Sequence, residues 1–396
     1  MLDFEYYGPT RIIFGRESLG GLAAQMQKVN PKKLLLVYDG NPATMPIVDQ
    51  VKEVLNGGGV TYTEFFGIKS NPLLSKVMEG IELGRKENID FLLAVGGGSV
   101  IDTAKGIAAG LKLKDGEDIW RDYYFPKNRF NDALPMGVVL TIPASGSEAS
   151  FGTVLTHDEL LTKRYTGGES LIPKFAILNP EFTMSLPPYQ TASGVFDIVS
   201  HLIERYFVNF PHVDLSDRMI EACIRTMLNT APILVDDPTN YDARAEVMWA
   251  GCIAHNKILE MGRTHGDWAS HDIAHELSAM YEISHGGSLA VIMPSWMRYV
   301  YKHNIPKFHQ FACRVFDVDV AYNQIDDVIN TMIERLEDFI HTMGLPTKLK
   351  GAGIGNNDFE LLASNAMEGR KYLGTGNGII LLGKEDILEI LKMAEK

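Results

Sequence analysis

Cysteine is scarce in this chain. Only three cysteines occur among 396 residues, at Cys223, Cys252 and Cys313, and none has the short spacing of a redox or zinc motif. We therefore expect no disulfide framework. A chain that uses so little cysteine fits a reducing compartment, and we expect it in the cytoplasm.

Long apolar runs and clusters of positive charge are also missing. No stretch approaches the roughly 20 apolar residues of a transmembrane helix, and residues 1–5 lack the basic and then apolar profile of a signal peptide. The formal net charge is −13, and no block of lysine or arginine follows a helix. Nucleic acids and anionic lipids both attract clustered cations, so we expect neither a nucleic-acid nor a membrane partner.

The first half of the chain alternates strand and helix signals. Apolar runs of strand length are separated by stretches whose apolar residues recur at helical intervals. The apolar runs are 34–38, 91–95 and 137–142, and the helical stretches are 46–55, 73–86 and 100–111. Continuous apolar strands separated by helices indicate a parallel sheet that is buried on both faces.

The second half has almost only helical patterns, which begin at Pro187-Pro188. The segments are 188–208, 214–234, 241–262, 268–281, 287–303 and 322–343. A chain of 396 residues is longer than one hydrophobic core usually serves. We therefore predict two domains: a Rossmann-like α/β domain over residues 1–186 and an all-helical domain over 187–396, with a ligand cleft between them.

A glycine-rich turn follows the predicted strand at 91–95 and opens a helix. Its residues are Gly96, Gly97, Gly98 and Ser99. Glycines let the backbone approach a ligand closely, and a helix N-terminus offers N–H groups and a positive dipole end to an anion. A pyrophosphate fits this arrangement, although Ile101 breaks the usual G-x-G-x-x-G spacing. The same residues also suit a tight strand-to-helix turn without a ligand.

Polar residues follow two further predicted strands. The loop at 141–148, with the sequence TIPASGSE, is rich in hydroxyl groups that could line the same cofactor or cap the next helix. Asp39 ends the strand at 34–38, where an acidic side chain can accept hydrogen bonds from an adenosine ribose. An Asp-Gly pair in this position also forms simple turns.

The strongest signal lies in the helical half. Asp197 and His201 are four residues apart, which places them one turn apart on one helix face. His271 and His275 repeat that spacing, and His285 begins the next helical segment. A single histidine is more often a core or surface residue. One carboxylate and three imidazoles, however, form a complete ligand set for zinc or ferrous iron, so the joint pattern predicts a metal site.

Together these motifs resemble those of the iron-activated (group III) alcohol dehydrogenases, over essentially the whole chain. The shared features are the glycine-serine turn with Asp102 three residues after Ser99, the Thr-x-Pro…Gly-Ser-Glu loop, the Asp-x-x-x-His helix and the His-x-x-x-His…His-Gly stretch. The sequences GDWASH at 266–271 and HELSA at 275–279 resemble the branch of butanol dehydrogenases and broad-range aldehyde reductases.

The resemblance implies an alcohol dehydrogenase or aldehyde reductase that uses NAD(P)H and one divalent metal, Fe²⁺ or Zn²⁺. The expected partners are a small alcohol or aldehyde and a second copy of the chain in a homodimer. The implied metal ligands are Asp197, His201, His271 and His285. The implied cofactor contacts are Asp39, Gly97, Gly98, Ser99, Asp102, Thr141, Ser145 and Lys163. His275 would not bind the metal but would act near the nicotinamide and substrate, as a proton relay or as a positioning residue.

Two departures from the family pattern bear on the cofactor. The hydroxyl loop is shorter than the Thr-Thr-Ala-Gly-Thr form of many relatives, so Ser145 need not make the cofactor contacts that the longer loop makes. Asp39 stands where the aldehyde-reductase branch, which prefers the phosphorylated cofactor, often has glycine. Because a carboxylate repels a 2′-phosphate, Asp39 favours NAD.

Three other functions are compatible with parts of the pattern. A polyol (glycerol-type) dehydrogenase or a dehydroquinate-synthase-like lyase would share the fold, and the latter also uses a metal and a nicotinamide cofactor. The Gly-Asp-Trp and His-Gly-Gly sequences favour the alcohol dehydrogenase instead. The third alternative function is that of a metal- or nucleotide-binding protein without turnover. The additional His275 beside a complete ligand set argues against this alternative.

Overall fold

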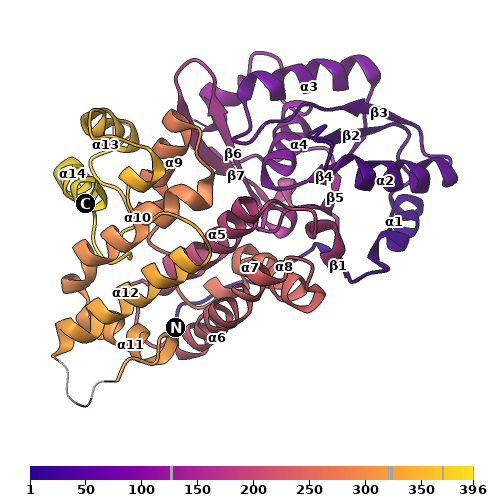
Figure 1. Cartoon of the computed structure of the whole chain (residues 1–396). Coiled ribbons are helices and arrows are strands. Elements are labelled where there is room, and N and C mark those ends of the chain that lie inside the picture. Colours follow the sequence, from indigo (N-terminus) through magenta and orange to yellow (C-terminus); the bar gives the residue numbers. More distant parts are fainter. Residues whose placement is uncertain (125–127, 320, 322–323, 368–369, 396) are drawn as a thin grey trace. The chain divides into compact units, whose positions relative to one another are not determined.

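The computed structural model describes residues 1–124, 128–319, 321, 324–367 and 370–395 (Figure 1). The chain separates into two compact units. The α/β unit comprises Tyr7–Leu186 and Thr239–Asn256, and the helical unit comprises Met1–Tyr6, Pro187–Pro238 and Lys257–Lys396. The chain thus passes from the α/β unit to the helical unit after Leu186. Two short segments are exceptions to this division, because Met1–Tyr6 belongs to the helical unit and Thr239–Asn256 to the α/β unit. The domain ranges 1–186 and 187–396 stay a prediction.

Six parallel strands form the sheet of the α/β unit, in the order β1-β8-β5-β4-β2-β3. They are β1 (Arg11–Phe14), β2 (Leu34–Tyr38), β3 (Tyr62–Phe65), β4 (Phe91–Gly96), β5 (Met136–Leu140) and β8 (Phe175–Leu178). The order reverses between β2 and β4, because the chain turns outward from β2 to β3 and then crosses back to β4. Open parallel sheets bind ligands outside the carboxyl ends of their strands at such a reversal. The predicted Rossmann-like parallel sheet is confirmed.

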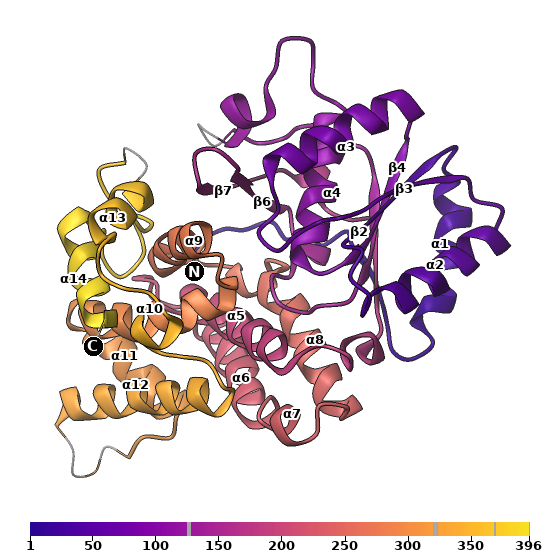
Figure 2. The same cartoon turned by 45° about the horizontal axis from the view of Figure 1, so that its top comes forward.

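Helices cover both faces of this sheet (Figure 2). One face is covered by α1 (Gly21–Val29) and α2 (Met45–Gly57), which pack on the side chains of Leu34 and Leu36. The other is covered by α3 (Leu74–Glu87) and α4 (Gly98–Gly110), which pack on Leu35 and Val37. Successive residues of β2 therefore serve two separate cores, which is why its sequence is apolar without alternation.

Three elements complete the α/β unit. The antiparallel hairpin of β6 (Gly152–His157) and β7 (Thr162–Gly167) lies beside α4. Helix α8 (Tyr241–His255) contributes buried Met248 and Cys252 to the core beneath α4. The short helical turns are η1 (Ser18–Gly20), η2 (Trp120–Tyr124), η3 (Ser147–Ala149), η4 (Glu169–Leu171) and η5 (Pro180–Thr183).

Helix α10 lies at the centre of the helical unit and is buried over most of its length, in contact with α5, α9, α12 and α14. The helices are α5 (Pro188–Tyr206), α6 (Asp214–Thr230), α7 (Ile233–Asp236), α9 (Ala269–Tyr281), α10 (His285–Val300), α11 (Ile305–Val315), α12 (Ile325–Thr342), α13 (Phe359–Met367) and α14 (Lys384–Glu395). The short turns are η6 (Ile258–Glu260), η7 (Tyr301–His303) and η8 (Lys350–Ala352). The predicted helical character is confirmed, and the described residues of this unit add only one isolated β-bridge, between Leu373 and Leu382.

Three predicted helices have different ends in the structure. The segment at 214–234 divides into α6 and α7 at Pro232, whose ring nitrogen has no hydrogen to donate. The segment at 241–262 ends at His255, and Lys257 then has a left-handed φ of 73°. Helix α12 begins at Ile325, while residues 322 and 323 of the predicted segment lie outside the described residues. In the described parts of the chain, no helix has both the length and the apolar character that a bilayer crossing requires.

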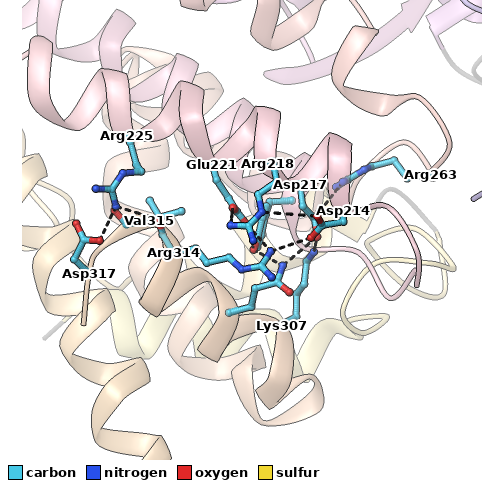
Figure 3. A network of polar contacts seen from close by, with 12 residues as sticks. Asp214, Asp217, Arg218, Glu221, Arg225, Arg263, Lys307, Arg314, Val315 and Asp317 are labelled. Carbon is cyan, nitrogen blue, oxygen red and sulfur yellow. Dashed lines mark hydrogen bonds and ion pairs between the residues drawn. The ribbon is translucent and has the colours of Figure 1, made fainter. Parts of the chain in front are cut away.

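Ion pairs join α6 to α11 and to the turn before α9 (Figure 3). Buried Asp217 accepts hydrogen bonds from Arg263 and from Lys307, and Arg314 donates to Glu221. Each of these two acids on α6 therefore has a basic partner from another segment. Buried charges are stable only when they are paired in this way, so the network fixes how these segments pack.

Candidate metal and cofactor sites

Helix α5 positions Asp197 and His201. It begins at Pro187-Pro188, where the fixed φ of proline suits the first helical turn. Asp197 and His201 then lie one turn apart on the buried face, with 3% and 5% of their surface exposed. The predicted Asp-x-x-x-His pair is therefore present as one pair of neighbouring side chains.

Helices α9 and α10 supply the histidines. His271 lies in the first turn of α9 and His285 is the first residue of α10, where the Ser284 hydroxyl accepts a hydrogen bond from the Gly287 amide. Gly286 follows His285 in the His-Gly-Gly sequence. A side chain is excluded at this position, because a Cβ at Gly286 would lie 1.9 Å from the carbonyl oxygen of Ser193. Only glycine permits this contact between α10 and α5, and the contact brings His285 to Asp197.

The four predicted ligands lie together within the helical unit. Ligand atoms of Asp197, His201 and His271 all lie within 4.8 Å of one another. The Nε2 atom of His285 lies 3.6 Å from Oδ1 of Asp197, and the rings of His271 and His285 are centred 5.3 Å apart. Asp197, His201 and His271 therefore form one compact group of possible ligand atoms, and His285 lies beside it, next to Asp197.

These residues fit a divalent metal. The Nε2 atom of His271 is buried and has no hydrogen-bond partner among the described residues. Leaving a polar atom unsatisfied inside a protein costs about 1–3 kcal/mol, so such an atom indicates a missing ligand. Neutral imidazole nitrogens with one carboxylate oxygen are a ligand set that suits Zn²⁺ and Fe²⁺.

Two buried carboxylates lie at the start of α9, and sequence analysis assigned neither of them to the site. Glu204 on α5 accepts a hydrogen bond from Nδ1 of His271 at 3.1 Å. Asp267 accepts from the amides of Ala269 and Ile379, and burial together with the charge of Glu204 raises the pKa of Asp267 to about 8. Glu204 follows His201 by three residues on the same helix, a spacing that could have indicated it.

Two further histidines have different positions. His275 is half-buried on α9, and its ring centre lies 4.8 Å from that of His285 and 6.4 Å from that of His271. Neither His275 nor His285 belongs to the compact group of Asp197, His201 and His271, and of the two it is His285 whose ring nitrogen lies near the Asp197 carboxylate. His265 lies apart, with a largely exposed side chain next to Glu260.

The α/β unit brings the predicted cofactor residues to one edge of the sheet. Asp39, Gly97 and Thr141 follow β2, β4 and β5, which are neighbouring strands, and all three lie at the carboxyl ends. Gly97 precedes α4, so no side chain caps the start of that helix. The buried hydroxyl of Thr141 has no hydrogen-bond partner among the described residues, which fits a polar ligand here.

The glycine turn and the hydroxyl loop touch each other. A Cβ at Gly97 would lie 2.8 Å from the side chain of Ile142, and a Cβ at Gly98 would lie 2.5 Å from the hydroxyl oxygen of Ser145. Both glycines are therefore required for this packing, whether or not a ligand binds. Half-buried Ser99 and Ser145 remain beside the turn.

Buried charges hold the hydroxyl loop against α4. Asp102 accepts from the Ser147 hydroxyl at 2.6 Å and from the Val154 amide at 3.0 Å. Burial raises the pKa of Asp102, and the charges of Lys105 and Lys163 oppose that rise. Lys105 donates to the carbonyl oxygens of residues 147, 150 and 152. These bonds give Asp102 a structural role, and its contact with a cofactor stays a prediction.

Lys163 and Asp39 have local partners. The ammonium of Lys163, on β7, donates to the side chain of Asn71 at 2.9 Å. The carboxylate of Asp39 accepts from the Asn41 amide at 2.9 Å and from the Thr44 hydroxyl at 3.1 Å, so Asp39 also forms the turn that begins α2. Each carboxylate oxygen retains a second lone pair for another donor.

Two family models match the chain. Residues 9–180 match iron-containing alcohol dehydrogenase, and residues 191–395 match the C-terminal domain of the Fe-containing alcohol dehydrogenase family. The chain belongs to the iron-containing alcohol dehydrogenase family. The resemblance inferred from the motifs is thereby confirmed.

Members of the iron-containing alcohol dehydrogenase family resemble this chain over its full length. A probable NADH-dependent butanol dehydrogenase 1 of Bacillus subtilis is 41% identical, covering 99% of both chains. The NADPH-dependent aldehyde reductase YqhD of Escherichia coli is 34% identical, covering 96% of this chain and 97% of its own. The crystal structure of NADH-dependent butanol dehydrogenase A from Thermotoga maritima superposes with a TM-score of 0.94 at 36% identity, covering 100% and 99% of the two chains.

Proposed function

We propose that this protein is a metal-dependent alcohol dehydrogenase that interconverts a primary alcohol and its aldehyde with a nicotinamide cofactor. The observation that carries the proposal is the buried group of Asp197, His201 and His271 with half-buried His285 beside Asp197, in a chain of the iron-containing alcohol dehydrogenase family. Relatives named as butanol dehydrogenases and as an aldehyde reductase support the substrate class. Family membership also disfavours a binding protein without turnover.

The four residues of that cluster would hold the metal, which is Fe²⁺ or Zn²⁺. When bound, the metal supplies a Lewis acid for the substrate oxygen, and the nicotinamide ring supplies or accepts the hydride. The protein's own contribution is to fix the ligands on three packed helices. Because Asp197, His201 and His271 are buried, water is kept away from the reacting groups.

The cofactor would lie along the carboxyl edge of the sheet. Gly97, Gly98 and Ser99 would offer the amides at the start of α4 to the pyrophosphate. Thr141, Ser145 and Lys163 would flank the ribose and the nicotinamide, and the buried hydroxyl of Thr141 supports this. Asp102 would hold the hydroxyl loop in place beside the cofactor through its hydrogen bond from Ser147.

NAD is the proposed form of the cofactor, on the strength of Asp39. Its carboxylate lies at the end of β2, where it would repel a 2′-phosphate. The Bacillus subtilis relative is named as NADH-dependent and the Escherichia coli relative as NADPH-dependent, so Asp39 is the residue to test.

His275 is the proposed proton relay. It adjoins His285 and is only half-buried, so a proton can pass between it and solvent. Alcohol oxidation releases a proton and aldehyde reduction consumes one, and histidine exchanges protons near neutral pH.

The test is an assay of NADH oxidation with butyraldehyde by the purified, metal-loaded protein. We expect stoichiometric and net consumption of NADH, and Asp197→Ala should abolish it. A dehydroquinate-synthase-like lyase regenerates its cofactor in each cycle and would show no net consumption. A polyol dehydrogenase would instead prefer glycerol as substrate for NAD reduction. Either result would refute the proposal.

A cytoplasmic homodimer completes the proposal. The three cysteines are all free thiols, which suits a reducing compartment. Strand β1 lies at an edge of the sheet and pairs only with β8 among the described strands, so its other side can pair with a second copy. Light scattering of the purified protein would give the mass of a single chain if the dimer were wrong.

A further inference from the structure

Glu204 is a buried acid beside the metal cluster. It lies on α5 one turn after His201, and none of its surface is exposed. Its carboxylate accepts hydrogen bonds from the Trp268 amide at 2.7 Å, from the Ser270 hydroxyl, and from the amide of His271 at 3.2 Å. It also accepts from Nδ1 of His271 at 3.1 Å. All these donors come from one short segment at the start of α9.

That segment needs an outside partner. Trp268, the residue before α9, has a left-handed φ of 66°, which is unusual for a large side chain, and it makes no side-chain cap. The carboxyl group of Glu204 accepts hydrogen bonds from amides at both ends of this turn, those of Trp268 and His271. Asp267 accepts from the Ala269 amide, and Glu204, from a different helix, accepts from the Trp268 and His271 amides at the same helix start.

The same carboxylate sets the hydrogen position on His271. Both oxygens of Glu204 already accept from backbone amides, which can only donate, so the contact with His271 is satisfied when Nδ1 carries the hydrogen and Nε2 carries the lone pair. Nε2 is the buried atom that has no partner among the described residues, and His271 belongs to the group formed with Asp197 and His201. Glu204 thus selects the tautomer that can bind a metal and fixes the plane of the ring.

We propose that Glu204 is a positioning residue that holds the His271 ring in the tautomer and orientation of a metal ligand and thereby strengthens metal binding. The inference rests on the proposed function, because it requires that the cluster holds a metal. Helix α5 then contributes in two ways, since Asp197 and His201 face the metal while Glu204 orients a ligand from another helix. Carboxylates behind metal-binding histidines tune metal affinity in this way.

The test compares Zn²⁺ affinity in the full-length protein, measured by competition with a chromophoric chelator. Glu204→Gln keeps the size of the side chain but replaces one acceptor oxygen with a donor. We expect Zn²⁺ to bind about 10- to 100-fold more weakly. The matched control is Glu260→Gln, because Glu260 is a buried acid of the same unit that pairs with Arg205 and His265 and makes no bond to His271. Its Zn²⁺ affinity should equal that of the wild type.

Two further measurements separate positioning from general stabilisation. In a His271→Ala background, Glu204→Gln should cause no further loss of Zn²⁺ affinity, since the ligand through which Glu204 acts is gone. In the Co²⁺-substituted protein, Glu204→Gln should shift the visible absorption bands, which report ligand geometry. If Glu204→Gln does not fold, Glu204→Asp, which keeps the charge but retracts the carboxylate, takes its place.

The inference is overturned if the Glu204 variant binds Zn²⁺ as tightly as the wild type, or if the Glu260 variant loses as much affinity. An equal loss with and without His271 would also overturn it. A wild-type protein that binds no Zn²⁺ at all would instead refute the metal site of the proposed function, so the two failures are distinguishable.

Discussion

Replacing Glu148 with glutamine should change how the stability of the protein depends on pH. Glu148 lies in η3 within the hydroxyl loop and is almost fully buried. Burial raises the pKa of its carboxyl from 4.5 to about 7, against the opposing effects of its own backbone amide and of the charge of Lys105. Glutamine has the same shape and does not ionise, so it isolates the contribution of this one proton.

The magnitude follows from the two pKa values. The folded protein holds the proton more tightly than the unfolded chain, so the carboxyl favours folding below its ordinary pKa. This advantage is lost as the pH rises from 4.5 through about 7. Each pKa unit corresponds to about 1.4 kcal/mol, so between about pH 5 and about pH 8 the wild type should lose roughly 2–3 kcal/mol of unfolding free energy through this group. Glu148→Gln should not show this loss.

Urea unfolding of both proteins, followed by circular dichroism and by tryptophan fluorescence, provides the measurement. The difference in unfolding free energy, variant minus wild type, should increase by that amount between the two pH values. Comparing differences cancels the titrating groups that do not interact with Glu148. Lys105 is the exception, because the charge of Glu148 raises its pKa, which burial lowers to about 8. A difference that stays constant with pH would show that Glu148 ionises normally, and the argument from burial would then be wrong.

Further expectations concern the two proposed sites. Chelation should lower the melting temperature of the wild type, and Zn²⁺ at 100 times its dissociation constant should restore about 2.7 kcal/mol; calorimetry of His271→Ala should show no such response. His275→Ala should lower kcat by about 10²- to 10⁴-fold and flatten the pH–rate profile near neutrality, with metal content unchanged by elemental analysis. An unchanged profile with weaker cofactor binding would leave only a positioning role. Asp39→Gly should raise kcat/KM with NADPH by about tenfold, the effect of about 1.4 kcal/mol of relieved repulsion. Equal ratios of NADH to NADPH efficiency in both proteins would contradict that reasoning.

The sequence predicts well whatever depends on neighbours along one helix or strand. The spacing of Asp197 and His201 fixes a shared helix face, because helix geometry is local. The apolar runs of β2 and β4 likewise indicate strands buried on both faces. These local patterns are enough to predict the parallel sheet and the helical unit, while the assignment of the metal ligands stays a prediction.

Features that depend on distant contacts could not be predicted in this way. The need for glycine at Gly286 follows from the carbonyl of Ser193, which belongs to another helix. Glu204 has a readable spacing from His201, but its partner His271 is far along the chain, and an acid without a known partner looks like a surface residue. Strand β1 is short and pairs only with β8 among the described strands, although β8 follows it by more than 160 positions.

The return of the chain to the α/β unit at Thr239–Asn256 has a consequence for its synthesis. Helix α8 brings Met248 and Cys252 into the core that also contains residues of β2, β4 and α4. A nascent chain released only as far as Leu186 contains the residues of all six strands of the sheet but lacks α8, which supplies part of their core. The α/β unit is therefore completed only after α5 and α6 have left the ribosome, and fragments intended to contain it must extend to Asn256 or supply α8 separately.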